Sequence, residues 1–230
     1  MSHSKLFLVS GGSGGIGSAV CDALADRGHR PMVGYYQNRE RADLIARRTG
    51  GYSVLLDMTS PESILSACQT IASMKENLAG VVLAGSPPPI LTPFAKMSQQ
   101  DLAQQFQVNV LGPQLLLADL VRNCFRKVKS GTIVGVLTKA MGDGIGTASS
   151  GMGGYVIGKY GLKGLLAVLA ADYPWLRVRA VSPGYTETQM LNVFDDRFLE
   201  LQRAQIKFST PAEIAAIITE AIFDHERGVL

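Results

Sequence analysis

The sequence predicts an α/β protein: a single domain with a doubly wound parallel sheet and helices on both faces. Short apolar runs alternate with longer helix-like stretches from end to end, which is the order expected for parallel strands joined by helices. Several runs are apolar at successive positions, as in strands buried on both faces. The length of 230 residues suits one domain with a substantial core.

The strands are expected where a short apolar run precedes a turn or a helix-like stretch. In chain order, the predicted strands are Leu6–Val9, Met32–Tyr36, Ser53–Leu56, Val81–Ala84, Thr132–Leu137 and Val178–Val181.

Helices are expected between these strands, and three of them have clear N-terminal signals. Ser60 precedes Pro61, a residue favoured in the first helical turn. Ser98 precedes another helix-like stretch. Thr210 and Glu213 have the spacing of a capping box, in which each residue bonds the backbone of the other.

Composition excludes several classes of protein. Hydrophobic residues make up 47% of the chain and charged residues 18%, so the chain is not intrinsically disordered. A net charge of +3 without a basic stripe gives no reason to expect a nucleic-acid partner. The three Cys and three His are scattered, which predicts neither a disulfide framework nor a metal site. No run is long enough for a membrane helix, and we expect a reduced, cytoplasmic protein.

A glycine-rich turn follows the first predicted strand. Residues 12–17 read Gly-Ser-Gly-Gly-Ile-Gly, and a helical pattern begins at once. Glycines allow a tight turn and let backbone N–H groups approach a pyrophosphate at a helix N-terminus. The position between the first strand and the first helix favours the dinucleotide site of a Rossmann fold over an ordinary turn.

The end of the second predicted strand bears on which dinucleotide binds. An NAD site usually has a carboxylate there for the ribose 2′-hydroxyl. Here the first acidic residue, Glu40, comes after the strand, and Arg39 and Arg41 stand where a 2′-phosphate would lie. Because the guanidinium fork suits phosphate, NADP(H) is favoured over NAD(H). The alternative is that these arginines form a solvated helix face.

Tyr155 and Lys159 form a candidate catalytic pair. Residues four apart on a helix share a face, so the two side chains can meet. A nearby ammonium favours the phenolate and lowers the tyrosine pKa from about 10, which suits proton transfer near neutral pH. The pair could be an ordinary surface pair. Its place after the fifth strand favours an active site, because such sites lie beyond the carboxyl ends of parallel strands.

Five segments in order resemble the short-chain dehydrogenases/reductases, in their single-domain form. Residues 10–17 resemble the family's glycine motif, and residues 57–58 the acidic residue and its neighbour that hold the adenine. Residues 108–110 resemble the segment with the catalytic Asn, and residues 155–159 match its Tyr-x-x-x-Lys signature. Residues 182–190 resemble the Pro-Gly segment that contacts the nicotinamide.

The resemblance implies roles for four catalytic residues. Tyr155 is the general acid/base, Lys159 assists it and holds the nicotinamide ribose, Asn109 positions a water, and Thr138 orients the substrate oxygen. No metal is expected. The implied cofactor-binding residues are Ser10, Gly11, Ser13, Gly15, Ile16, Gly17, Tyr36, Asn38, Arg39, Asp57, Met58, Ala84, Gly85, Pro183, Gly184, Thr186 and Thr188.

The chain departs from the family pattern in three places. Of the usual Asn-Asn-Ala-Gly after the fourth strand, only Ala84 and Gly85 remain. Thr138 stands in the usual catalytic Ser position, and Ser149 or Ser150 in a lengthened loop could supply the hydroxyl instead. The family continues into a seventh strand, whereas this chain stops at residue 230, so we expect the last strand to be truncated or missing.

Taken together, these residues imply an NADP(H)-dependent oxidoreductase that transfers hydride between nicotinamide and a carbonyl or alcohol, as a ketoreductase does. Within the family the chain resembles 3-oxoacyl-thioester (acyl carrier protein) reductases, so carrier-bound or CoA thioesters are candidate substrates, and a homotetramer or homodimer is expected. The substrate loops are expected at residues 86–96, 139–154 and 186–208. The alternatives are a degenerate member that binds NADP(H) without turnover, and a dehydratase or epimerase that retains its cofactor.

Overall fold

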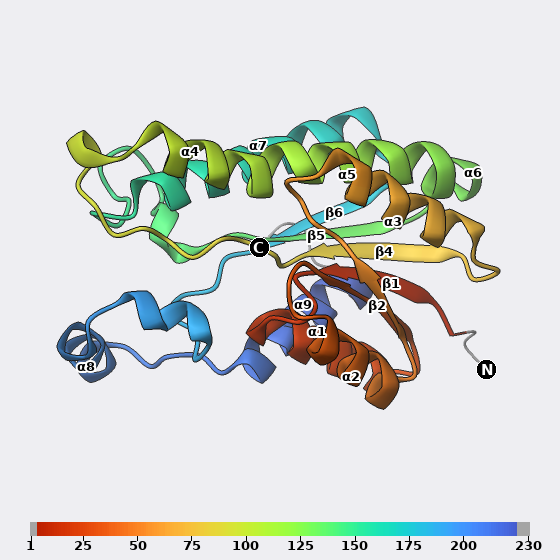
Figure 1. Ribbon diagram of the computed structural model, residues 1–230, viewed down its shortest axis with the longest axis horizontal. Helices are drawn as coiled ribbons and strands as arrows, with labels where there is room; N and C mark the ends of the chain where they lie inside the picture. Colours follow the sequence, from red (N-terminus) through yellow and green to blue (C-terminus); the bar gives the residue numbers. More distant parts are fainter. Residues whose placement is uncertain (1–3, 225–230) are drawn as a thin grey trace.

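The computed structural model describes residues 4–224, and these residues form one parallel sheet with helices on both faces (Figure 1). The strand order is β3-β2-β1-β4-β5-β6, so the direction of winding reverses between β1 and β4. The reversal leaves a crevice at the carboxyl ends of these two strands, where ligands bind in open α/β sheets. The strands are β1 (Leu6–Ser10), β2 (Arg30–Tyr35), β3 (Tyr52–Leu55), β4 (Leu78–Leu83), β5 (Thr132–Val136) and β6 (Arg177–Val181).

All six predicted strands are confirmed, although β4 begins three residues earlier than predicted. Its first residues, Leu78-Ala-Gly80, carry little apolar signal, yet they pair with β1 and β5. Gly80 is needed there because a Cβ would lie 2.5 Å from the carbonyl oxygen of Thr132.

Two helical layers cover the sheet. Side chains on one face, such as Val9 and Val33, pack against α1, α2 and α9, and those on the other face, such as Leu8 and Ile133, pack against α3, α5 and α7. Figure 1 shows the two layers above and below the strands. The helices are α1 (Gly15–Asp26), α2 (Arg39–Thr49), α3 (Pro61–Ser73), α4 (Gln99–Phe106), α5 (Gly112–Leu120), α6 (Arg126–Val128), α7 (Gly153–Asp172), α8 (Asp196–Gln205) and α9 (Pro211–Phe223).

The three predicted helix starts are confirmed. The side chains of Ser60 and Ser98 each accept a hydrogen bond from the backbone N–H three residues on. Thr210 Oγ1 accepts from the N–H of Glu213 at 3.2 Å, and Glu213 Oε2 accepts from the N–H of Thr210 at 2.7 Å. These caps fix where the helices leave the sheet.

Short 3₁₀ and π segments shape the connections at the carboxyl edge. The 3₁₀ segments η1 (Phe94–Lys96), η4 (Lys139–Met141) and η5 (Gln189–Val193) lie in the three predicted substrate loops. Two π segments, η2 (Gln107–Leu111) and η3 (Val121–Phe125), interrupt the helix that contains α4 and α5. In Figure 1 the loops form two lobes on the left, with η5 and α8 in the lower one.

The expected loss of the last strand cannot be followed to the end of the chain, because residues 225–230 lie outside the described residues. Within residues 4–224 the sheet has six strands. None of the helices in this range combines the length and hydropathy needed to cross a membrane. The same range contains no cluster of three or more His, Cys, Asp or Glu that could hold a metal ion.

Candidate active site

The glycine-rich turn places an uncapped helix N-terminus at the crevice. Helix α1 begins at Gly15, and its N-cap, Gly14, makes no side-chain cap. The first N–H groups of a helix have no intrahelical partner, so here they are free to bind an anion. Gly11 has φ +63°, and a Cβ on it would lie 2.6 Å from the Cα of Gly85. A Cβ on Gly17 would overlap the carbonyl oxygen of Gly11. The turn therefore fits a pyrophosphate only with glycines at these positions.

Two further contacts bring distant segments to this turn. Ser10 Oγ accepts a hydrogen bond from the N–H of Gly85 at 3.3 Å, which joins the ends of β1 and β4. A Cβ on Gly15 would lie 2.5 Å from Cγ2 of Thr188, so the loop that contains η5 lies against the start of α1.

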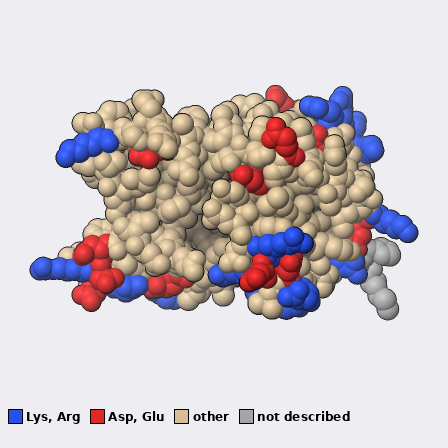
Figure 2. Space-filling model, in the orientation of Figure 1, with Lys and Arg blue, Asp and Glu red and all other residues tan. Residues whose placement is uncertain are grey.

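A cavity opens at the carboxyl edge of the sheet, and all three predicted substrate loops contribute to it. Figure 2 shows this face hollowed between the two lobes, with mostly uncharged residues around the hollow. Nine of the residues predicted from the sequence line it: Ile16, Ala84, Thr138, Tyr155, Lys159, Pro183, Gly184, Thr186 and Thr188.

Tyr155 and Thr138 both line this cavity. Tyr155 is buried at the start of α7, near enough to the Thr138 hydroxyl for that hydroxyl to influence its pKa. Thr138 Oγ1 accepts from the N–H of Ala140 at 3.1 Å, which orients the hydroxyl. Burial raises the pKa of Tyr155 above its ordinary value, and the Thr138 hydroxyl partly offsets this. Ser149 lines the cavity but is exposed, whereas Ser150 is exposed and does not line it.

Lys159 is buried one turn further along α7. Its Nζ donates to the carbonyl oxygen of Val136 at 2.8 Å and lies 5.7 Å from the centre of the Tyr155 ring. Burial lowers the pKa of Lys159 to about 7, because the charged form is poorly solvated. The Tyr155–Lys159 spacing predicts that Lys159 lowers the Tyr155 pKa. In this structure burial is the main influence and raises that pKa, and Thr138, not Lys159, lowers it.

Asn109 lies behind the cavity, in the π segment η2. Its Nδ2 donates to the backbone oxygen and to Oε1 of Gln105, both at 3.0 Å. Its Oδ1 is buried and has no partner within the described residues. π segments inside helices often occur at functional sites. The sequence identified Asn109 but missed Gln105, whose four-residue spacing from Asn109 on a helix was the available signal.

The candidate adenine and ribose residues lie at the ends of β2 and β3. Asp57 Oδ1 accepts from the N–H and the Oγ1 of Thr59, at 2.8 and 2.7 Å. The side chain of Met58 packs in the core, so only its backbone can face a ligand. The Met58 side chain is therefore excluded from the predicted site.

Tyr36 and Asn38 follow the end of β2. Tyr36 is exposed, and Asn38 Oδ1 caps α2 by accepting from the N–H of Arg41 at 3.0 Å.

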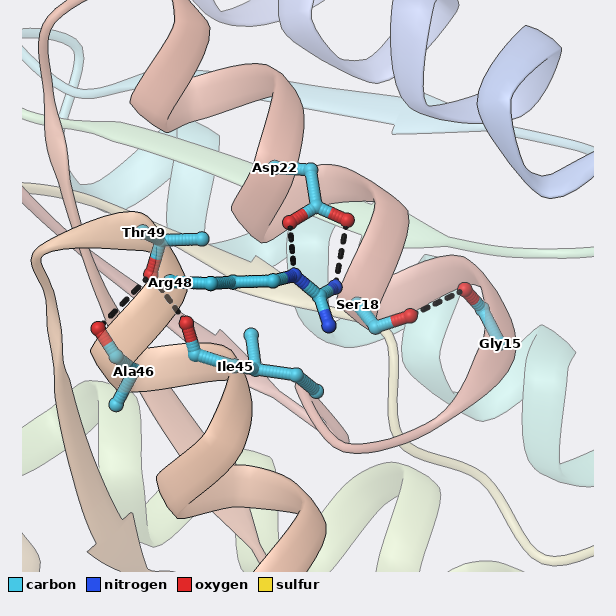
Figure 3. Close-up of polar contacts among 7 residues, drawn as sticks. All are labelled: Gly15, Ser18, Asp22, Ile45, Ala46, Arg48 and Thr49. Atoms are coloured by element: carbon cyan, nitrogen blue, oxygen red, sulfur yellow. Dashed lines mark hydrogen bonds and ion pairs between the residues drawn. The ribbon is translucent and has the colours of Figure 1, made fainter.

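The arginines of α2 are not equivalent. Arg48 makes two bonds to the carboxylate of Asp22, at 2.8 and 2.7 Å, which Figure 3 shows beside Gly15 and Ser18. Arg39 is exposed and lies 3.6 Å from Asp43. Arg41 is half-buried and lines a second hollow with Gly15 and Ser18 at the start of α1.

Two lysines are the charged residues that line the active-site cavity among the residues described. Lys159 is buried, whereas Lys139 is exposed at the start of η4. No sequence motif identified Lys139 as a site residue, although it directly follows Thr138. With no carboxylate in the described lining, the cavity favours anionic groups and developing negative charge.

The sequence profile described as "short chain dehydrogenase" matches residues 5–197. The chain belongs to the short-chain dehydrogenase family. It is 28% identical over 236 residues to an acetoacetyl-CoA reductase of Acinetobacter sp. (strain RA3849), covering 98% of this chain and 93% of that protein. It is 30% identical over 222 residues to the 3-oxoacyl-[acyl-carrier-protein] reductase FabG of Escherichia coli (strain K12), covering 91% of this chain and 83% of that protein.

Solved structures of low sequence identity share the fold. The crystal structure titled gox2181 superposes with a TM-score of 0.88 at 21% identity, covering 99% of this chain and 93% of the other. This likeness supports the arrangement of the sheet and its helices.

Titration of Lys159 should make the stability of the protein depend on pH. The folded-state pKa is about 7, and the ordinary value is 10.5, so between these values the unfolded chain holds a proton that the folded chain has released. The free energy of unfolding should therefore rise with pH across this window, by up to about 1.4 kcal/mol per pH unit. The gain is lost as the pH falls through 7.

The measurement is urea unfolding at several pH values from neutral to alkaline, for the wild type and for Lys159→Met. The difference between the two proteins isolates the lysine, because other titrating groups are common to both. Parallel stability curves for the two proteins would show that Lys159 stays protonated in the fold.

Proposed function

We propose that this protein is an NADP(H)-dependent oxidoreductase that moves hydride between nicotinamide and a carbonyl or alcohol carbon, and that it acts as a ketoreductase. The observation that carries the proposal is that Thr138, Tyr155 and Lys159 line one cavity beside the uncapped start of α1. A proton-donating pair thus lies beside a site suited to a dinucleotide.

When bound, the nicotinamide supplies the hydride. The protein supplies the proton and the orientation of the substrate. Thr138 donates a hydrogen bond to the substrate oxygen, and Tyr155 delivers its phenol proton to the developing alkoxide. A raised pKa suits this role, because Tyr155 is then protonated at neutral pH.

Lys159 and Asn109 assist the proton transfer by Tyr155. Lys159 has a pKa of about 7, so it can both hold and release a proton near neutral pH. It holds the nicotinamide ribose, and Asn109 positions a water that returns a proton toward Tyr155. The unpartnered Oδ1 of Asn109 is a buried acceptor available for such a water.

A 3-oxoacyl thioester, bound to CoA or to a carrier protein, is the substrate class that we propose. The two reductases compared above carry acetoacetyl-CoA and 3-oxoacyl-[acyl-carrier-protein] in their names. The apolar lining residues Met152, Leu191 and Phe194 of this cavity suit the binding of an acyl chain. Ile206 also lines the cavity, and both it and Phe94 are exposed apolar side chains on the substrate loops.

Assembly as a homotetramer or homodimer is part of the proposal. Leu111 and Val168 are large apolar side chains that remain exposed in η2 and α7. Such side chains are typical of surfaces that pack against another subunit.

The function is tested by following NADPH oxidation with acetoacetyl-CoA, and with simple ketones, sugars and quinones for comparison. We expect NADPH to be consumed in equal amount to the hydroxy product, fastest with the thioester. Cofactor binding without turnover across the panel would support the degenerate member instead. A substrate converted with no net NADPH consumption would support the dehydratase or epimerase.

Cofactor preference should depend on Arg41. We expect NADPH to bind more tightly than NADH, and Arg41→Ala to weaken NADPH by about 10-fold or more while NADH changes little, as for loss of a charged hydrogen bond. Arg39→Ala should weaken NADPH binding less, because Arg39 is exposed and pairs with Asp43. Arg47→Ala, in the last turn of α2, is the control. Equal wild-type dissociation constants for the two cofactors by titration would refute the preference.

Thr138 should carry the third catalytic hydroxyl. Thr138→Val keeps the shape and removes the donor, so turnover should fall by about 100- to 1,000-fold. Thr138→Ser should stay near the wild-type rate. Ser149→Ala and Ser150→Ala are matched controls in the exposed loop and should have small effects. Full activity in Thr138→Val together with loss in either serine variant would assign the hydroxyl to the loop.

A further inference from the structure

Gln105 is a buried polar side chain between the catalytic helix and the first substrate loop. It lies near the end of α4 and is 4% exposed. Both ends of its amide are bonded: Nε2 donates to the carbonyl oxygen of Pro88, and Oε1 accepts from Nδ2 of Asn109, each at 3.0 Å. A buried amide is costly unless its hydrogen bonds are made, and here one bond reaches the substrate loop and the other reaches Asn109, one turn further along the same helix.

The segment on one side is the proline end of substrate loop 86–96, which lies before the point where Thr92 pairs with the backbone of Gly151. Residues 87–89 are three successive prolines, which have no N–H to donate. Their neighbour Ser86 and the third proline, Pro89, line the active-site cavity. The bond from Gln105 to Pro88 therefore fixes the backbone between two cavity-lining residues.

The same side chain packs against the helix that carries Tyr155 and Lys159. A Cβ on Gly158 would lie 3.3 Å from the Cβ of Gln105, and a Cβ on Gly154 would lie 3.6 Å from its Cγ. These glycines directly precede the two catalytic residues in the chain. Small residues there allow Gln105 to lie close to α7.

We propose that Gln105 is a positioning residue that couples substrate loop 86–96 to Asn109, so that one side chain fixes both the proline end of the loop and the orientation of the Asn109 amide. The inference rests on the proposed function for its kinetic consequences. The bond from Gln105 to the Pro88 carbonyl oxygen, here called the anchor, is a property of the fold and is tested separately.

The first experiment measures the anchor without any catalysis. Gln105→Met keeps the length of the side chain and removes both bonds, and Gln104→Met is the control, since Gln104 is the exposed neighbour on α4. Backbone hydrogen exchange should speed up across residues 90–96 in Gln105→Met, by about 5- to 10-fold for the loss of one hydrogen bond, and should not change in the control. Unchanged exchange in this segment would overturn the proposal.

The second experiment separates the two bonds kinetically, with NADPH and acetoacetyl-CoA. Gln105→Met should raise KM by about 5- to 10-fold through the freed loop and also lower kcat through Asn109. In Gln105→Glu an ionised carboxylate still accepts from Asn109 but cannot donate to Pro88, so KM should rise while kcat is largely kept. Protonation restores the donor, so the KM of this variant should return toward the wild-type value as the pH falls.

A purely structural role would lower thermal stability in both variants and leave KM and its pH dependence as in the wild type, and that result would overturn the proposal. Absence of NADPH oxidation in the wild type would instead count against the proposed function. In that case the exchange experiment still decides whether Gln105 anchors the loop.

Discussion

The close approach of two glycines, Gly11 after β1 and Gly85 after β4, is the constraint on which the rest of the site depends. Gly11 adopts a left-handed conformation, and a side chain on it would collide with the backbone at Gly85. Because the glycine turn fits closely between these strands, α1 starts at the crevice, and the N–H groups of its first turn have no side-chain cap. The same crevice receives Thr138 from the end of β5 and Tyr155 from α7. An anion site and a proton-transfer site thus share one edge of the sheet.

Burial sets the chemistry of the catalytic groups in opposite directions. It raises the pKa of Tyr155 and lowers that of Lys159 to about 7, so near pH 7 the phenol is neutral and the lysine is partly deprotonated. A neutral phenol is a competent acid, and a lysine near its pKa exchanges protons readily. The nearby Thr138 hydroxyl favours the phenolate and so lowers the Tyr155 pKa, which couples the residue proposed to orient the substrate to the residue proposed to protonate it.

Side-chain contacts support the loops around the cavity, which lie outside the regular strands and long helices. The three prolines of residues 87–89 offer only carbonyl groups, and one of these is taken up by Gln105. The π segment η2 presents Asn109 from the same helix, with its amide held by Gln105. On the opposite lobe, Tyr185 stacks on Phe208 with ring centres 5.0 Å apart, and Arg203 pairs with Glu187. Substrate loops 86–96 and 186–208 are therefore supported by different side-chain contacts.

The sequence by itself determined the order of the strands in the chain, the caps at Ser60, Ser98 and Thr210, the glycine turn and the Tyr155–Lys159 spacing. These are local features: each depends on residues a few positions apart, which periodicity and side-chain chemistry reveal. Only the tertiary structure decided which arginine faces the start of α1, that the Met58 side chain is core, that burial is the main influence on the Tyr155 pKa, and that the Gln105 amide reaches Pro88. Those properties depend on burial and on contacts between distant parts of the chain, and no local pattern encodes them.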